Sequence, residues 1–86
     1  MNLYDIHPHA FKHHLSNRDI RHAWRNGIAW TRRNREDGRV DYLLVGQDTR
    51  GRLVELLARL TPKGYIVFHA FTPPTKKTLR ELGIIA

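Results

Sequence analysis

The residues best suited to chemistry in this sequence are histidines. Five of the six lie in one stretch, "HPHAFKHHLSNRDIRHAWRNG", which runs from His7 to Gly27 and has Asp19 as its single carboxylate. Imidazole has the side-chain pKa closest to neutrality, so it can accept or donate a proton under physiological conditions. Four cations are interleaved with these histidines: Lys12, Arg18, Arg21 and Arg25.

Metal-free cleavage of RNA requires groups of these types. A base removes the proton of the 2′-hydroxyl, a cation neutralises charge on the phosphorane-like transition state, and an acid protonates the departing 5′-oxygen. Histidines beside lysine and arginine supply all three. The alternative is a solvated basic helix that happens to be rich in histidine, and the residues alone leave both interpretations open.

A metal site is the other chemistry that clustered histidines suggest. His9 and His13, four residues apart, would share one face of a helix and could together hold zinc. Zinc needs three or four protein ligands, yet the chain has no cysteine and no glutamate stands near these histidines. His69 could join them from the sheet. We expect no metal site and no cofactor.

His69 and Glu55 are isolated polar residues in apolar runs. If the intervening "TPKG" is a simple four-residue loop, Leu60 pairs with Tyr65 and His69 lies opposite Leu56. A loop one residue longer or shorter inverts the parity and can place His69 beside Glu55. Spacing alone leaves open whether the two residues form one site or face solvent separately.

These side chains must be positioned by a helical first third of the chain. "HPHAFKHHL" (7–15) predicts a short helix with Pro8 in its first turn. Ser16, with Asp19 three positions later, is a capping-box pattern for a second helix that continues through residues 18–30. One buried face of that helix is predicted by apolar residues at helical spacing, namely Ile20, Ala23, Trp24, Gly27 and Ile28.

The middle of the chain is rich in strand-forming residues. Residues 40–47, 52–60 and 65–71 predict an antiparallel meander with turns at "DTRG" and "TPKG". Residues 31–33 would add an edge strand. The expected fold class is α+β, with two N-terminal helices packed on a three- to four-stranded antiparallel sheet and a short C-terminal helix. That last helix is bounded by Pro73, Pro74, Thr75 and Gly83.

The composition of the chain indicates which kinds of binding partner to expect. The 86 residues suit a single domain spanning 1–86. Fifteen lysines and arginines against eight carboxylates give a net charge of +7, which favours a polyanion such as nucleic acid or an acidic protein. The absence of cysteine fits a reducing cytosol. Because no apolar run reaches the roughly 18 residues of a membrane span and no secretory signal is visible, we expect a cytoplasmic protein with no membrane partner.

Three segments carry a resemblance to a known family. "HPHAFKHHLSNRDIRHAW", "DYLLVGQDTRGRLVEL" and "VFHAF" followed by lysines resemble the BrnT-like toxins of the RelE/ParE superfamily, over roughly residues 7–77. The resemblance implies a RelE-like fold and a metal-independent endoribonuclease, the toxin of a type II toxin–antitoxin system. It also implies a cognate acidic antitoxin encoded nearby, through which the toxin–antitoxin complex would bind operator DNA.

The resemblance also implies an active site. The family's helix-one pattern matches His9, Ala10, Lys12 and His13, its strand–turn–strand pattern matches Val45, Gly46, Asp48, Gly51, Arg52, Leu53, Glu55 and Leu56, and its last motifs match His69, Ala70 and Lys76. His13 or His9 would act as base or acid and His69 as the second proton-transfer group. Glu55 would orient one of them.

Cations complete the implied site. Lys12, Arg52 and Lys76 would hold the scissile phosphate. Where the family carries an arginine before the last lysine, this chain has Pro73 or Pro74, and Lys77 or Arg80 would replace that arginine. The residues expected to bind RNA are Arg18, Arg21, Arg25, Arg50, Arg52, Lys77 and Arg80.

Two other functions stay open at this point. A non-catalytic nucleic-acid-binding module would use "RDIRHAWRNG" as the reading helix of a helix-turn-helix. A protein-targeting member of the same superfold, like a gyrase poison, would use its sheet to bind an acidic protein. Neither would need the histidines to move protons.

Overall fold

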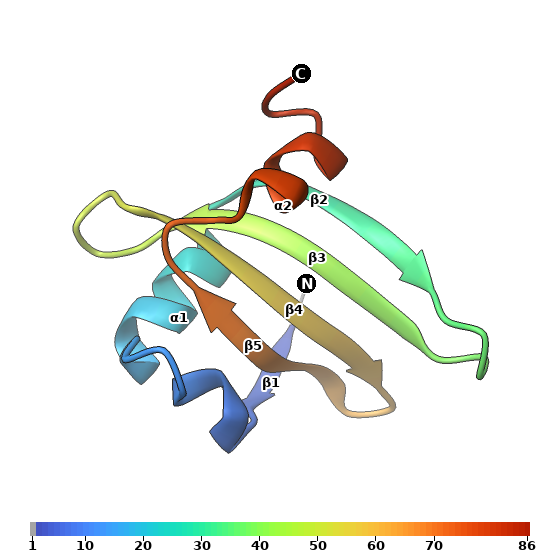
Figure 1. Cartoon of the computed structure of the whole chain (residues 1–86). Helices are drawn as coiled ribbons and strands as arrows, with labels where there is room; N and C mark the ends of the chain where they lie inside the picture. Colours follow the sequence, from blue (N-terminus) through green and yellow to red (C-terminus); the bar gives the residue numbers. More distant parts are fainter. Residues whose placement is uncertain (1) are drawn as a thin grey trace.

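The computed structural model describes residues 2–86; Met1, the first residue of the expected domain, lies outside them. The described chain forms a five-stranded sheet in the order β1-β5-β4-β3-β2, with helices on both faces (Figure 1). β1 pairs with β5 in parallel, and the other neighbouring strands are antiparallel. In chain order the elements are β1 (Leu3–Ile6), the 3-10 helix η1 (Pro8–Phe11), α1 (Asn17–Arg25), β2 (Gly27–Asn34), β3 (Val40–Gln47), β4 (Leu53–Thr61), β5 (Gly64–Phe71) and α2 (Lys76–Glu81).

The meander of β3, β4 and β5 confirms the strands expected from the sequence, each within one residue of the expected bounds. β2 includes the edge strand expected at residues 31–33. Asp48 organises the β3–β4 turn, because its Oδ1 accepts backbone N–H groups of Arg50 and Arg52, each at 2.9 Å. Gly51 adopts φ +77° there, a conformation that glycine reaches without a steric penalty.

α1 begins where the sequence predicts. Ser16 Oγ accepts the backbone N–H of Asp19 at 3.0 Å, and the Asp19 carboxylate accepts the Ser16 hydroxyl at 3.1 Å. The helix ends at Arg25, so the prediction that it continues to residue 30 is wrong. From Gly27 the chain is extended and pairs with β3, which leaves the side chain of Ile28 55% exposed instead of buried on a helical stripe.

The expected pair of N-terminal helices is the main error. Residues 7–15 form only the four-residue η1, and His14 adopts φ +66°, which an α-helix cannot accommodate. The preceding residues form β1, a strand that the sequence analysis missed. Within residues 2–86 the sheet is therefore mixed and larger than expected, and it carries one α-helix of nine residues, α1, and a six-residue α2. The expected fold class is overturned by this arrangement.

The two faces of the sheet bury different groups. α2 lies on the face opposite α1 (Figure 1) and is fixed by Arg33, whose guanidinium donates to both carboxylate oxygens of Glu81 at 2.8 and 2.6 Å. That face carries the buried Leu43, Val45 and Glu55, at positions that alternate with those of the other face. The face under α1 and η1 holds the main apolar core, made by Ile6, Ala10, Leu15, Ile20, Ala23, Trp24, Leu44, Val54, Leu56, Ala58, Val67 and Ala70.

The sequence analysis expects no membrane-spanning segment, and the helices of the structure can be compared with that expectation. Across residues 2–86, none of them combines the length and the apolar character that crossing a bilayer requires.

Candidate functional site

A β-bulge in β5 decides which way His69 points. Tyr65 pairs with Leu60, as the four-residue loop predicts, and Val67 pairs with Ala58. His69 then pairs with Leu57, so Phe68 is the extra residue between two consecutive pairs. Because the bulge inverts the parity of the rest of the strand, His69 lies on the same face as Glu55. Of the two alternatives left open by the spacing, His69 takes the one beside Glu55, and the cause is a bulge within the strand and not the length of the loop.

Glu55 binds His69 directly. His69 Nε2 lies 2.9 Å from Glu55 Oε2, and Glu55 Oε1 accepts the backbone N–H of Thr75 at 2.8 Å. The side chain of Glu55 is 7% exposed and that of His69 is 29% exposed. The carboxylate thus joins β4, β5 and the start of α2.

The charge state of Glu55 follows from these bonds. Burial raises its pKa, but hydrogen bonds from the Thr75 N–H, the His69 ring and the Thr78 hydroxyl outweigh burial and hold the pKa below its ordinary value. Glu55 is therefore an ionised acceptor at neutral pH. Because a carboxylate only accepts, His69 Nε2 must carry a hydrogen, and Nδ1 is left as the nitrogen that can exchange a proton.

His13 completes a cluster of rings. His13 follows η1 in the chain. The segment between β1 and η1 stays attached to β5, because the His7 N–H donates to the Val67 carbonyl at 2.7 Å. The ring centroid of His13 is 6.0 Å from that of His69 and 4.9 Å from that of Phe71. His13 is exposed, so two imidazoles of different exposure meet at the edge of β5, with a carboxylate behind one of them. The sequence analysis missed Phe71 and the contact of Thr75 with Glu55; Thr75 was expected only as a helix cap.

His9 does not belong to this cluster. The helical spacing that would place it beside His13 never forms, because η1 ends at Phe11. His9 packs edge-on against His7 instead, with 4.7 Å between ring centroids. In residues 2–86, no group of three or more histidines, cysteines or carboxylates is arranged to hold a metal ion.

The expected phosphate-binding cations fall into two groups. Lys12 and Lys76 are exposed and adjoin the cluster along the chain, since Lys12 precedes His13 and Lys76 follows Thr75. Arg52 instead binds the buried Asp48 at 2.6 Å, so part of its charge is already compensated. Burial raises the pKa of Asp48, but hydrogen bonds from Arg52 and Arg50 outweigh it and keep the pKa low.

The cations expected to bind RNA lie on several elements. Arg50 is exposed in the β3–β4 turn, and Lys77 and Arg80 are exposed on α2. Arg18, Arg21 and Arg25 lie on α1, across the sheet from Glu55 and His69. The structure thus distributes these residues over both faces and does not gather them into one site.

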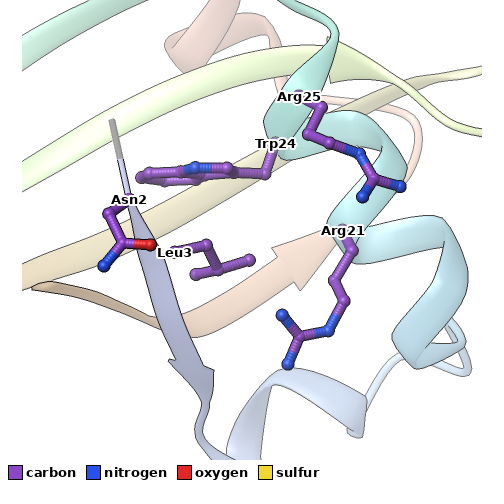
Figure 2. Close-up of a pocket in the computed structure, with 5 residues that line it drawn as sticks. All are labelled: Asn2, Leu3, Arg21, Trp24 and Arg25. Atoms are coloured by element: carbon purple, nitrogen blue, oxygen red, sulfur yellow. The ribbon is translucent and has the colours of Figure 1, made fainter.

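Two surface hollows lie away from the imidazole cluster. One, of about 430 Å³, is an open bend of the β2–β3 turn lined by Asn34, Arg35, Glu36 and Asp37. The other, of about 240 Å³, lies between α1 and the start of β1 (Figure 2) and is lined by Asn2, Leu3, Arg21, Trp24 and Arg25.

Comparison with protein-family models, with curated proteins and with solved structures finds no match for this chain. The resemblance to BrnT-like toxins therefore rests on short sequence motifs alone.

Proposed function

We propose that this protein is a metal-independent endoribonuclease and the toxin of a type II toxin–antitoxin pair in the cytoplasm. The observation that supports the proposal best is the meeting of His13 and His69 beside a buried, ionised Glu55. Two imidazoles whose centroids are 6.0 Å apart can each reach a different oxygen of one phosphodiester. A basic protein of net charge +7 attracts such a substrate.

The cleavage step assigns the two imidazoles to opposite proton transfers. One removes the proton of the 2′-hydroxyl, whose oxygen attacks phosphorus as the bond to the 5′-oxygen breaks; the other gives its proton to that oxygen. The products are a 2′,3′-cyclic phosphate and a 5′-hydroxyl. Glu55 keeps the hydrogen of His69 on Nε2 and fixes the orientation of that ring, while Lys12 and Lys76 neutralise the developing charge.

The biological context in this proposal comes from the residue resemblance. An acidic antitoxin encoded beside the toxin would neutralise the excess of positive charge, and the toxin–antitoxin complex would bind operator DNA through the antitoxin. Co-expression of such a partner should suppress any growth arrest that this protein causes.

The test is cleavage of RNA by the purified protein in the presence of EDTA. We expect products ending in 2′,3′-cyclic or 3′-phosphate. His13→Ala and His69→Ala should each reduce the rate by about 10²–10⁴-fold, the usual contribution of a general acid or base. His14→Asn is the matched control, since His14 is the exposed neighbour of His13 and asparagine tolerates its positive φ.

Three results would contradict the proposal. Full activity in both alanine variants would mean that the imidazole cluster is not the active site. Salt-dependent RNA binding without any cleavage would instead favour a non-catalytic binding module, and toxicity that persists in the histidine variants would favour a protein target.

A further inference from the structure

The hollow between α1 and β1 has the composition of a nucleotide-binding pocket. Arg21 and Arg25, one helical turn apart on α1, both line the hollow, and their side chains leave the helix in different directions (Figure 2). The indole of Trp24, which is only 6% exposed, borders the hollow beside Leu3, and Asn2, the residue before β1, also lines it. Two guanidinium forks, an aromatic ring and an amide are the groups that hold a phosphate and a base.

The positive charge of this pocket is uncompensated by neighbouring carboxylates. Five other arginines form ion pairs, and these are Arg33, Arg35, Arg39, Arg52 and Arg59. In the described part of the chain, neither Arg21 nor Arg25 forms an ion pair with a carboxylate. Arg21 Nε donates to Asn17 Oδ1 at 2.7 Å, which steadies its guanidinium beside the hollow without neutralising it.

The size of the hollow favours one unit of a polymer over a complete small molecule. Its volume of about 240 Å³ lies below the roughly 300–1,000 Å³ of pockets that enclose drug-sized ligands. A sugar or base against the indole edge would fill it, while phosphates of the strand contact the two arginines and the rest of the strand runs outside. A base can enter such a pocket only from a single strand, because duplex bases are stacked and paired.

We propose that this α1–β1 pocket binds one nucleotide of a single-stranded RNA, with phosphates of the strand against Arg21 and Arg25 and the base or sugar against Trp24, Leu3 and Asn2. The proposal rests on RNA being the substrate. The pocket lies across the sheet from Glu55 and His69, so it contacts the strand away from the cleaved bond. It sets affinity and strand placement and takes no part in proton transfer.

The test is the binding of a fluorescent, mixed-sequence single strand made of 2′-O-methyl RNA, which cannot be cleaved through its 2′-oxygen. In the Trp30→Phe background, Trp24 is the remaining tryptophan, and its fluorescence should change on binding. Arg21→Lys with Arg25→Lys retains the charge but removes the bidentate forks, and we expect about tenfold weaker binding. The matched double change, Arg32→Lys with Arg39→Lys in β2 and the following turn, should bind as the parent does.

Three other outcomes would contradict the proposal that this pocket binds one nucleotide of an RNA strand. Equal binding by both lysine variants would mean that only the general positive field attracts RNA. A nucleoside monophosphate that binds as tightly as the strand would indicate a mononucleotide site, and poly-glutamate with the same dependence on the two arginines would indicate an acidic protein partner. Because the probe cannot be cleaved, its binding is independent of the cleavage test, so the pocket and the proposed ribonuclease can fail separately.

Discussion

At the scale of single residues, Glu55 connects the parts of the candidate site. One oxygen binds the His69 ring and the other accepts the Thr75 N–H, so three elements meet at one buried carboxylate. Glutamine at this position could still accept from Thr75, but its amide would donate to His69 Nε2. The hydrogen of the ring would then move to Nδ1, and the nitrogen that exchanges protons in the proposed reaction would be altered.

Glu55 should also make stability depend on pH. Burial raises its pKa, and the hydrogen bonds that outweigh burial leave the folded-state value below that of the unfolded chain. The resulting stabilisation is complete above the ordinary glutamate pKa of about 4.5 and is lost as the pH falls through the folded-state value. We expect the melting temperature of Glu55→Gln to fall less steeply than that of the parent below pH 5, as measured by circular dichroism.

Glu36→Gln is the control for that experiment, because Glu36 is exposed in the β2–β3 turn. Its melting curve should follow the parent at every pH. Parallel curves for the parent and Glu55→Gln would mean that Glu55 is not preferentially ionised in the folded state.

The sequence could identify Glu55, His69 and His13 as members of this site but not their contact. His69 and Glu55 are recognisable as polar residues in apolar runs. Their meeting depends on the bulge at Phe68, which no glycine or proline marks in "YIVFHAF". His9 illustrates the opposite error, because the expected i, i+4 spacing exists only if a helix forms.

At the scale of elements, α1 lies unusually close to β3. A Cβ atom at Gly46 would overlap the backbone carbonyl of Ala23, and backbone on both sides leaves little room to adjust. The position thus requires glycine for reasons of space, although its φ is ordinary. This contact holds the last turn of α1 against β3.

Gly46→Ala should therefore destabilise the protein by roughly 1–3 kcal/mol, the usual cost of overpacking, measured by urea denaturation. Gly27→Ala is the matched control in the adjacent strand, where the new methyl would meet side-chain atoms of Leu44 at 3.1 Å or more and no backbone atom. We expect it to change stability by about 0.5 kcal/mol or less. Equal losses in the two variants would contradict the close approach of α1.

Local sequence signals predicted the elements that are bounded by helix caps or turn residues. Ser16 and Asp19 mark the start of α1, and the turn residues separate β3, β4 and β5 as expected. β1 was missed because it is only four residues long and pairs with a strand some sixty residues later, a contact without a local signature. The first helix was overestimated, since the apolar spacing in residues 7–15 is equally compatible with a single 3-10 turn.

At the scale of the whole molecule, charge is distributed unevenly. Five arginines on β2, β4 and the turns beside β3 pair with carboxylates. In the described chain Arg18, Arg21 and Arg25 of α1 form no such pair, and neither do Arg32, Arg50 and Arg80. The sequence gives the net charge of +7 but not which cations are paired, because ion pairs such as Arg33–Glu81 join residues distant in the chain. Excess charge destabilises a compact state through self-repulsion.

Added salt should therefore stabilise the fold. Between low ionic strength and about 0.15 M, screening reduces repulsion among exposed cations, and each kcal/mol recovered raises the melting temperature by roughly 4–8 °C. The triple variant Arg18→Gln, Arg21→Gln and Arg25→Gln, which lacks three of the seven net charges, should show a smaller rise. A melting temperature that falls with salt would mean that the ion pairs outweigh the repulsion.

The extra residue in β5 also constrains how this protein can evolve. Val67 and Ala70 enter the main core on either side of the bulge, while His69 between them faces Glu55. Loss or gain of one codon between those for Gly64 and Phe71 would exchange the two faces over part of the strand. His69 would then point into the apolar core, and Ala70 would leave it. Descendants of this gene should accordingly accept length changes in the neighbouring turns while keeping the length of this strand fixed.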